Sequence, residues 1–197
     1  MSAGRQPLVV ATRNQHKLAE LHEILADYEL LPLPARIELP PEDGETFAAN
    51  ALGKARAASA ATGLHAIADD SGIEASALGG RPGVRSARYA GEDATDEENL
   101  RLLLTEVGRH DDRSVAYVCA MASVSADGTE VVEQGRCEGR LAESPRGAGG
   151  FGYDPAFVPD ELDGELTMAE ITPANKHSIS HRGRAARALA ERLRGAG

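Results

Sequence analysis

Short apolar runs alternate with longer stretches of helical spacing along this chain. The apolar runs predict strands at 8–11, 29–33, 64–68 and 156–158. Apolar residues three or four apart predict helices at 17–28, 46–62, 95–107 and 180–194. A helical turn is expected at 167–171. Two further strand-like segments, 114–125 and 129–137, flank Asp127-Gly128, a dipeptide that favours a tight hairpin turn.

Local signals mark several ends of these elements. Thr95 followed by Glu98 is a capping-box pattern, which predicts a helix start. Gly63 is placed to end the 46–62 helix in the left-handed conformation. Residues 72–91 and 145–153 are rich in glycine, so we expect strand plus ordered loop in the first and a loop in the second. The order predicts a mixed α/β fold with a parallel part near the N-terminus and an antiparallel hairpin later.

Composition narrows the class of protein. The 197 residues predict a single domain, 1–197, with two small domains as the alternative, and the chain is long enough to bury its own core. A net charge of −10 argues against binding to nucleic acid or to a membrane surface, although local loops can still bind an anionic small molecule. Cys119 and Cys137 show no metal-site spacing and are expected as reduced, buried residues. Without an apolar leader or span, we expect a cytoplasmic protein.

Asp69 and Asp70 stand where the apolar run 64–68 stops, at the predicted end of a strand. Side chains of neighbouring strand residues point to opposite faces, so only one of the two carboxylates reaches a given site. The other is expected to orient backbone or a neighbouring side chain. A carboxylate at a strand end beside a phosphate-binding loop is a candidate Mg²⁺ ligand.

Two segments carry donors suited to phosphate. Residues 12–17 join the first strand to the first helix, where free backbone N–H groups and the helix dipole favour anions. The segment lacks the spacing of either common phosphate-binding loop, and a capped, solvated turn is the alternative. Asn50 and Lys54 share a helix face beside an alanine stripe, where Lys54 either reaches a phosphate or simply extends to solvent.

Aromatic and basic residues near the C-terminus suggest a binding site for a planar, acceptor-rich ligand. Phe151 and Tyr153 lie on a glycine-rich loop, where an aromatic ring either stacks on a base or fills the core. Lys176, His181 and Arg182 precede or begin the last helix, where cations are unfavourable for helix stability alone. The alternative interpretation is that these three residues form a basic, solvated helix face and bind no ligand.

The segments above form an ordered series of motifs that runs from Leu8 to about Leu193. The series is Thr12-x-Asn-x-x-Lys17, Thr46-Phe-x-x-Asn-Ala-x-x-Lys-Ala55, Ala68-Asp-Asp-Ser-Gly72, Leu78-Gly-Gly-Arg-Pro-Gly83 with Ser86-Ala-Arg-Tyr89, Gly149-Gly-Phe-Gly-Tyr-Asp-Pro155 and Glu170-Ile-Thr-x-x-x-Lys176 with Ser180-His-Arg-Gly183. It strongly resembles the inosine triphosphate pyrophosphatase family, the XTP/dITP diphosphatases.

The resemblance implies a fold and an activity. The implied fold is an elongated, mixed α/β sheet with flanking helices and two lobes around a central substrate cleft, usually assembled as a homodimer. The implied enzyme is an XTP/dITP diphosphatase that hydrolyses ITP, dITP and XTP to the monophosphate and pyrophosphate. Such an enzyme cleanses the nucleotide pool, with Mg²⁺ as cofactor and purine nucleoside triphosphates as its small-molecule partners.

The same resemblance implies roles for individual residues. Asp70 and Lys54 are the implied catalytic residues, and Asp70 with Glu42 the implied metal ligands. The family has an acidic pair before the Thr46 motif, but position 41 here is proline, which leaves Glu42 as the candidate acid. The implied substrate contacts are Thr12, Arg13, Asn14, Gln15, His16, Lys17, Ser71, Phe151, Gly152, Tyr153, Asp154, Lys176, His181 and Arg182.

Three other functions are compatible with parts of the sequence. A pyrophosphatase for a different modified nucleotide would share the phosphate motifs but not the base-pocket string. A non-catalytic nucleotide-binding regulator on the same fold would be expected to lack Asp70 or Lys54, and both are present. A dinucleotide-binding oxidoreductase would carry a G-x-G-x-x-G motif after its first strand, and this chain does not.

Overall fold

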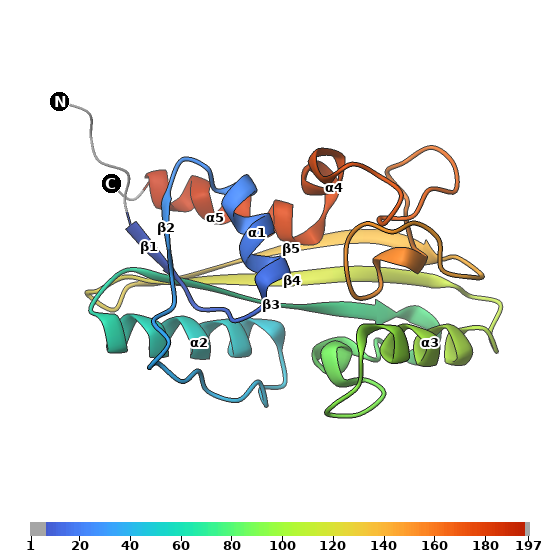
Figure 1. Ribbon diagram of the computed structural model, residues 1–197, viewed down its shortest axis with the longest axis horizontal. Helices are drawn as coiled ribbons and strands as arrows, with labels where there is room; N and C mark the ends of the chain where they lie inside the picture. The colour runs from blue at the N-terminus through green and yellow to red at the C-terminus, as the bar shows by residue number, and fades with distance from the viewer. Residues whose placement is uncertain (1–6, 196–197) are drawn as a thin grey trace. The chain divides into compact units, whose positions relative to one another are not determined.

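The computed structural model describes residues 7–195 and contains one mixed six-stranded sheet in the order β2-β1-β3-β4-β5-β6. The expectation of no secretory leader rests on residues 1–7, and of these only Pro7 lies within the described residues. The strands are β1 (Pro7–Val10), β2 (Glu29–Pro32), β3 (Ala66–Ala75), β4 (Ser114–Val124), β5 (Glu130–Leu141) and β6 (Phe157–Pro159). The predicted mixed α/β sheet with flanking helices is confirmed (Figure 1).

The described residues also form five α-helices and three short 3₁₀ turns. The α-helices are α1 (Gln15–Ile24), α2 (Phe47–Thr62), α3 (Asp96–Val107), α4 (Pro173–Ile179) and α5 (His181–Gly195). The 3₁₀ turns are η1 (Ser76–Leu78), η2 (Gly83–Arg88) and η3 (Asp154–Ala156). Within the described range, no helix has both the length and the apolar character needed to cross a bilayer.

The chain divides into two compact units. Among the described residues, the first contains 7–70, 119–135 and 182–195, and the second contains 71–118 and 136–181. Strands β3, β4 and β5 each contribute residues to both units. The central substrate cleft that the family resemblance implies stays a prediction.

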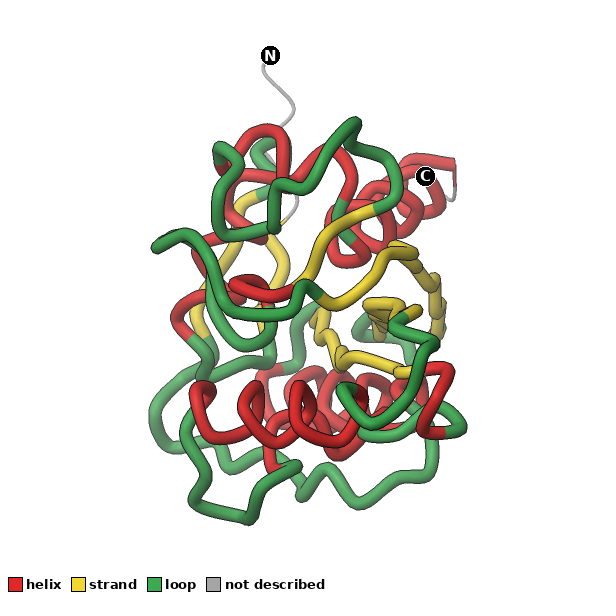
Figure 2. Tube along the Cα trace, turned by 90° about the vertical axis from the view of Figure 1, so that its right-hand side faces the viewer, coloured by secondary structure: helices red, strands yellow, loops and turns green. Residues whose placement is uncertain are grey.

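The first unit is built on parallel pairing around β1. Val9 lies opposite Leu31 of β2 and Ala66 of β3, and both pairings are parallel. Leu8 and Ile67 pack against Leu21 of α1 and Leu189 of α5 on one face of the sheet. The alanine-rich helix α2 covers the opposite face (Figures 1 and 2). Alanines bring α2 close to the sheet, and this places its polar residues near the polar part of β3.

The second unit has its own core around α3. Leu103 and Val107 of α3 are buried with Ile73, Tyr117 and Phe157. The capping box predicted for this helix is present: Thr95 Oγ1 accepts from the Glu98 amide at 3.2 Å, and the Thr95 amide donates to Glu98 at 2.8 Å. The β4–β5 hairpin is confirmed, and Gly128 in its turn has a φ of 88°.

Three predicted elements differ from the structure. The 64–68 strand continues as β3 to Ala75, so Asp69 and Asp70 lie inside a strand and not at its end. The strand was expected to end here because a buried carboxylate without a partner is unfavourable. In the structure both carboxylates have partners from other elements, so the strand continues. The helix predicted at 17–28 ends at Ile24, and the helical turn predicted at 167–171 contains no helix. Helix α4 was missed, although Thr172 caps it and Pro173 stands at its first position.

We expect Gly139→Ala to destabilise the second unit. A Cβ at Gly139 would lie 2.4 Å from the Val158 carbonyl oxygen and 2.9 Å from the Phe157 ring, and neither can withdraw without breaking the β5–β6 pairing. The expected loss is about 1–3 kcal/mol in the free energy of unfolding, measured by urea denaturation. Gly53→Ala in α2 is the control: its nearest neighbour would be Pro40 Cγ at 3.8 Å, so helix propensity should stabilise the protein slightly. Equal midpoints for the two variants would contradict the steric argument.

Candidate active site

The loop between β1 and α1 is ordered by its own side chains. Asn14 caps α1, and its Oδ1 accepts from the His16 amide at 2.9 Å and the Lys17 amide at 3.1 Å. Thr12 Oγ1 accepts from the Asn14 amide at 3.2 Å. Asn14 therefore satisfies two of the amides that the sequence analysis expected to be available to a phosphate. Thr12 and Lys17 are half-buried, whereas Gln15 and His16 are exposed.

Arg13 is turned toward the backbone that follows β2. Its guanidinium donates to the carbonyl oxygens of Leu33 and Pro34, both at 2.9 Å, and of Ile37 at 2.8 Å. This contact fixes the segment after β2 against the β1–α1 loop. In this arrangement Arg13 orders the loop that carries Asn14 and Lys17.

Asp69 lies at the centre of a buried ion network in the first unit. The residue lies on β3 and is 1% exposed. One carboxylate oxygen, Oδ2, lies 3.2 Å from Lys17 Nζ and accepts from Arg182 Nε and Nη2, each at 3.1 Å. Arg182 Nη1 also donates to Glu20 at 2.5 Å. The network therefore joins β3 to the first turns of α1 and α5.

The charges around Asp69 keep it ionised. Burial alone would raise the pKa of this carboxyl, but Lys17, Arg182 and Lys54 outweigh burial and hold its pKa well below the usual range. Asp69 Oδ1 is buried and has no hydrogen-bond partner within residues 7–195. The close contacts with Lys17 and Arg182 are therefore all made by Oδ2.

Asp70 and Lys54 lie in a second polar group beside this network. Asn50 Nδ2 donates to Asp70 Oδ2 at 2.8 Å, and Asn50 Oδ1 accepts from the Gly44 amide at 2.8 Å. Lys54 Nζ donates to Glu42 and, at 2.6 Å, to the backbone carbonyl of Asp69. Glu42, the acid that remained as a candidate because position 41 is proline, is thus the acid of the 42–45 segment that contacts Lys54.

The two acids of this group influence each other. Burial and the charge of Glu42 raise the pKa of Asp70, because two nearby carboxylates resist ionising together. Burial lowers the pKa of Lys54, but Asp69, Glu42 and Asp70 outweigh it and raise that pKa. A divalent cation would relieve the repulsion between Glu42 and Asp70. In the described part of the chain, no group of three or more His, Cys, Asp or Glu side chains could hold a metal ion by itself.

The second unit brings most of the predicted base-contacting residues together around Asp154. Its Oδ2 accepts from Lys176 Nζ at 2.7 Å and from the Phe151 amide at 2.9 Å. The Lys176 ammonium also lies 4.9 Å from the centre of the Phe151 ring, within cation–π range. Gly150 makes the close approach possible, since a Cβ there would lie 2.2 Å from the carboxylate. Asp154 is therefore a buried anchor of this loop.

The remaining predicted residues of the second unit have separate surroundings. Tyr153 is buried and donates its hydroxyl to the Ser86 carbonyl at 2.7 Å, and the Gly152 amide donates to Asp96 at 2.8 Å. The His181 ring is buried and stacks on Tyr117 with ring centres 4.5 Å apart. Ser71 is half-buried on β3, next to Asp70 in sequence.

Arg182 departs from its predicted surroundings. In the sequence it belongs to the same predicted binding group as Lys176 and His181, whereas its buried guanidinium donates to Asp69 and Glu20 of the first unit. Its contact with the substrate stays a prediction. Glu20 was missed because a lone acid on an amphipathic helix gives no local signal. Tyr117 was missed because an aromatic residue within an apolar strand is typical of the hydrophobic core.

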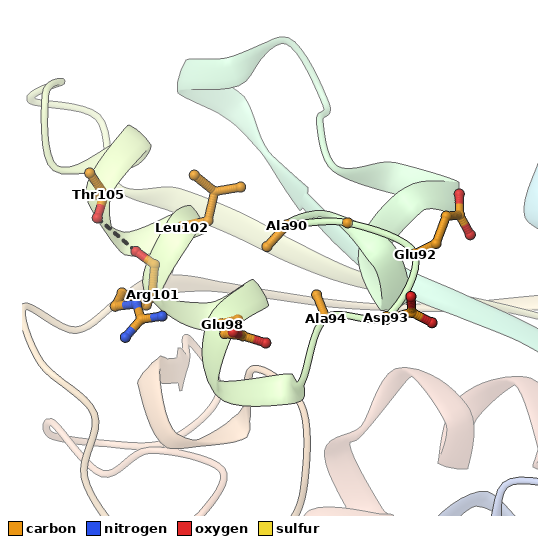
Figure 3. A pocket seen from close by; sticks show the side chains of 9 residues that line it. Ala90, Glu92, Asp93, Ala94, Glu98, Arg101, Leu102 and Thr105 are labelled. Carbon is orange, nitrogen blue, oxygen red and sulfur yellow. Dashed lines mark hydrogen bonds between the residues drawn. The ribbon is translucent and has the colours of Figure 1, made fainter.

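A separate open pocket lies between the 90–94 loop and α3, with a volume of about 720 Å³ (Figure 3). Glu92, Asp93 and Glu98 line it with Arg101, and none of the predicted site residues does. Three carboxylates against one guanidinium disfavour a triphosphate there. The candidate functional residues form two groups, one around Asp69 and Asp70 in the first unit and one around Asp154 in the second.

Solved structures define the class to which this fold belongs. A HAM1 protein from Coxiella burnetii is 40% identical and matches with a TM-score of 0.86, covering 96% of this chain and 99% of that one. The Ham1 protein of Staphylococcus aureus is 38% identical, also with a TM-score of 0.86, covering 98% of this chain and all of that one. The whole architecture is thus that of the HAM1 proteins.

Sequence comparison gives the family. The model described as the Ham1 family matches residues 8–192, and the chain belongs to this family. A relative from Cutibacterium acnes, named dITP/XTP pyrophosphatase, is 49% identical over 194 residues, which is 92% of this chain and 93% of the relative. A relative of the same name from Mycobacterium tuberculosis is 49% identical over 196 residues, 95% of each chain. The family resemblance predicted from the motifs is confirmed.

We expect Asp69→Asn to destabilise the protein by about 3–5 kcal/mol at neutral pH, because Arg182 and Lys17 would lose their shared counter-charge. The pKa of Asp69 is depressed in the folded state, so its stabilising effect is present above the unfolded pKa of about 3.9 and is lost as pH falls toward the folded value. The difference in unfolding free energy between wild type and variant should therefore shrink below about pH 4. Urea denaturation from pH 7 to pH 3 measures it, and a pH-independent difference would contradict the ionic role.

Proposed function

We propose that this protein is an XTP/dITP diphosphatase that hydrolyses ITP, dITP and XTP to the nucleoside monophosphate and pyrophosphate. The observation that carries the proposal is the group formed by Asp70, Glu42 and Lys54 in a chain that belongs to the Ham1 family. The relatives named dITP/XTP pyrophosphatase, about half identical over most of the chain, support the same substrates.

We propose that Asp70 and Glu42 hold Mg²⁺ together with oxygens of the substrate. Their mutual repulsion and the raised pKa of Asp70 fit a pair of carboxylates that needs a cation. When bound, the ion would supply Lewis-acid stabilisation of the charge that develops on the phosphates. Lys54 supports this arrangement by holding Glu42 in place.

We assign each residue of the first unit a separate role in the reaction at the phosphates. Asp70, steadied by Asn50, orients and deprotonates the attacking water at the α-phosphorus. Lys17 and Lys54 neutralise the charge that moves onto the pyrophosphate leaving group. Thr12 and Asn14 shape the loop beside Lys17, and Arg13 fixes that loop on the backbone after β2. Gln15 and His16 remain proposed contacts of the substrate, and so does Ser71 of the second unit.

The residues of the second unit serve the base. Phe151 supplies a face for stacking, Lys176 and His181 supply donors, and Tyr153 and Asp154 hold the loop that carries Gly152. Inosine and xanthosine present an acceptor oxygen at C6, whereas adenosine presents an amino donor there. A buried donor left unpaired costs binding energy, so adenine is disfavoured. Arg182 acts on the substrate through Asp69 and Lys17.

The remaining proposals concern organisation. We propose a single catalytic domain over 1–197, a homodimer and a cytoplasmic location where the nucleotide pool is used. A pyrophosphatase for another modified nucleotide and a nucleotide-binding regulator without activity are the alternatives. Sedimentation equilibrium measures the oligomeric state, and a substrate panel separates the three functions.

The panel consists of ITP, dITP, XTP, ATP, GTP and dUTP, assayed with and without Mg²⁺. We expect the first three to yield monophosphate and pyrophosphate in equal amounts, because attack at the α-phosphorus releases both phosphates together. Ion-exchange chromatography of the products identifies them. Removal of the metal by chelation should abolish turnover. Stepwise release of inorganic phosphate through a diphosphate would contradict the proposed reaction.

We expect Asp70→Asn to lower kcat about 10²–10⁴-fold while the fold is kept, since an amide neither accepts the proton from water nor binds Mg²⁺ strongly. Steady-state kinetics with ITP measure the loss, and circular dichroism reports the fold. Asp160→Asn, at an exposed acid next to β6, is the matched control and should retain wild-type activity. Near-native turnover of Asp70→Asn would remove this residue from the catalytic role.

A further inference from the structure

Tyr117 belongs to none of the sequence motifs, yet it touches the proposed base-contacting residues. It lies on β4 and is buried, with its ring between two others. The Phe157 ring centre is 4.4 Å away at an interplanar angle of 27°, and the His181 ring centre is 4.5 Å away at 13°. Phe157 is fully buried, so it fixes the Tyr117 ring, and the Tyr117 ring in turn sets the plane of His181.

The hydroxyl of Tyr117 reaches the anchor of the glycine-rich loop. It donates to Asp154 Oδ1 at 3.1 Å. The other oxygen of that carboxylate accepts from Lys176 Nζ and the Phe151 amide, at 2.7 and 2.9 Å. A carboxylate bonded on both oxygens is restrained in its rotation about the Cβ–Cγ bond. The position of Lys176 and of the Phe151 backbone therefore depends on the Tyr117 hydroxyl.

We propose that Tyr117 is the positioning residue for recognition of 6-oxopurine bases. It orients His181 by ring stacking, and it orients Lys176 and Phe151 through Asp154. The proposal rests on the proposed function, because it assigns a role in selecting among the same substrates. Tyr117 acts only through other residues and is not a catalytic residue.

The alternative role for Tyr117 is core packing, since it is buried with Ile73, Leu103 and Phe157. The two roles use different parts of the side chain. The ring supplies the apolar contacts, whereas the hydroxyl supplies the hydrogen bond to Asp154. Tyr117→Phe removes the second and keeps the first, and it leaves the Asp154 carboxylate held through Oδ2 alone, with less restraint on its rotation.

The test compares kcat/KM for ITP and ATP between wild type and Tyr117→Phe in the presence of Mg²⁺. We expect kcat/KM for ITP to fall about ten-fold, because donors to O6 and N7 lose their fixed positions. The loss should be mainly a higher KM, since base contacts serve ground state and transition state alike. The value for ATP should change less than about three-fold, so the ITP/ATP ratio shrinks. One common factor for both nucleotides would overturn the proposal.

Tyr28→Phe is the matched control. It removes one tyrosine hydroxyl bond, to the Ala190 carbonyl at 3.3 Å in the first unit, and should leave the ITP/ATP ratio unchanged. A double-mutant cycle with Lys176→Met adds a second readout. Because Tyr117 acts on Lys176 through Asp154, the two losses for ITP should be clearly less than additive. Full additivity would contradict the connection.

A binding experiment separates this inference from the proposed function. Calorimetry measures the equilibrium binding of ITP and of ATP to wild type and to Tyr117→Phe, without added metal. If wild type releases no pyrophosphate from ITP, the proposed reaction fails, while the binding ratio still tests Tyr117. If wild type hydrolyses ITP but Tyr117→Phe keeps both the kinetic and the binding ratio, the role of Tyr117 fails alone. Thermal unfolding of the variant confirms that it folds.

Discussion

The structure of the first unit depends on keeping the charge of Asp69 buried and compensated. A carboxylate removed from water is stable only when cations lie against it, and here Lys17 and Arg182 come from the starts of two different helices. This requirement fixes where α1 and α5 begin relative to β3. Asp70 follows Asp69 in β3 and accepts a hydrogen bond from Asn50 of α2. The position of the proposed reacting carboxylate therefore depends on the position of Asp69.

The second unit uses a buried carboxylate in a similar way but for a different purpose. Asp154 is compensated by one ammonium, from Lys176, and by neutral donors from Tyr117 and the loop backbone. Hydrogen bonds with defined directions make it suited to holding side chains at fixed orientations. The Asp69 network pairs the cations Lys17 and Arg182 with the carboxylates of Asp69 and Glu20, whereas the Asp154 group arranges directed hydrogen-bond donors around one carboxylate.

The sequence predicted those features that depend on nearby residues. The capping box at Thr95, the hairpin at Asp127-Gly128 and the end of α2 at Gly63 were all correct because each is a local backbone requirement. The end of β3 was wrong, since the partners that allow Asp69 inside a strand are far away in the chain. The motifs identified the family, yet they did not reveal that Arg182 serves Asp69 or that Tyr117 supports Asp154, because tertiary contacts decide both.

The glycine-rich loop limits how this site can be altered. Gly150 has a φ of 69° and no room for a side chain, because the Asp154 carboxylate occupies the space where a Cβ would stand. The loop therefore gains its shape from backbone alone and has little capacity to acquire new contacts there. A designer who wishes to change the nucleotide accepted by this scaffold would need to vary the helix and strand residues that face the loop, chiefly Lys176, and leave the loop itself intact.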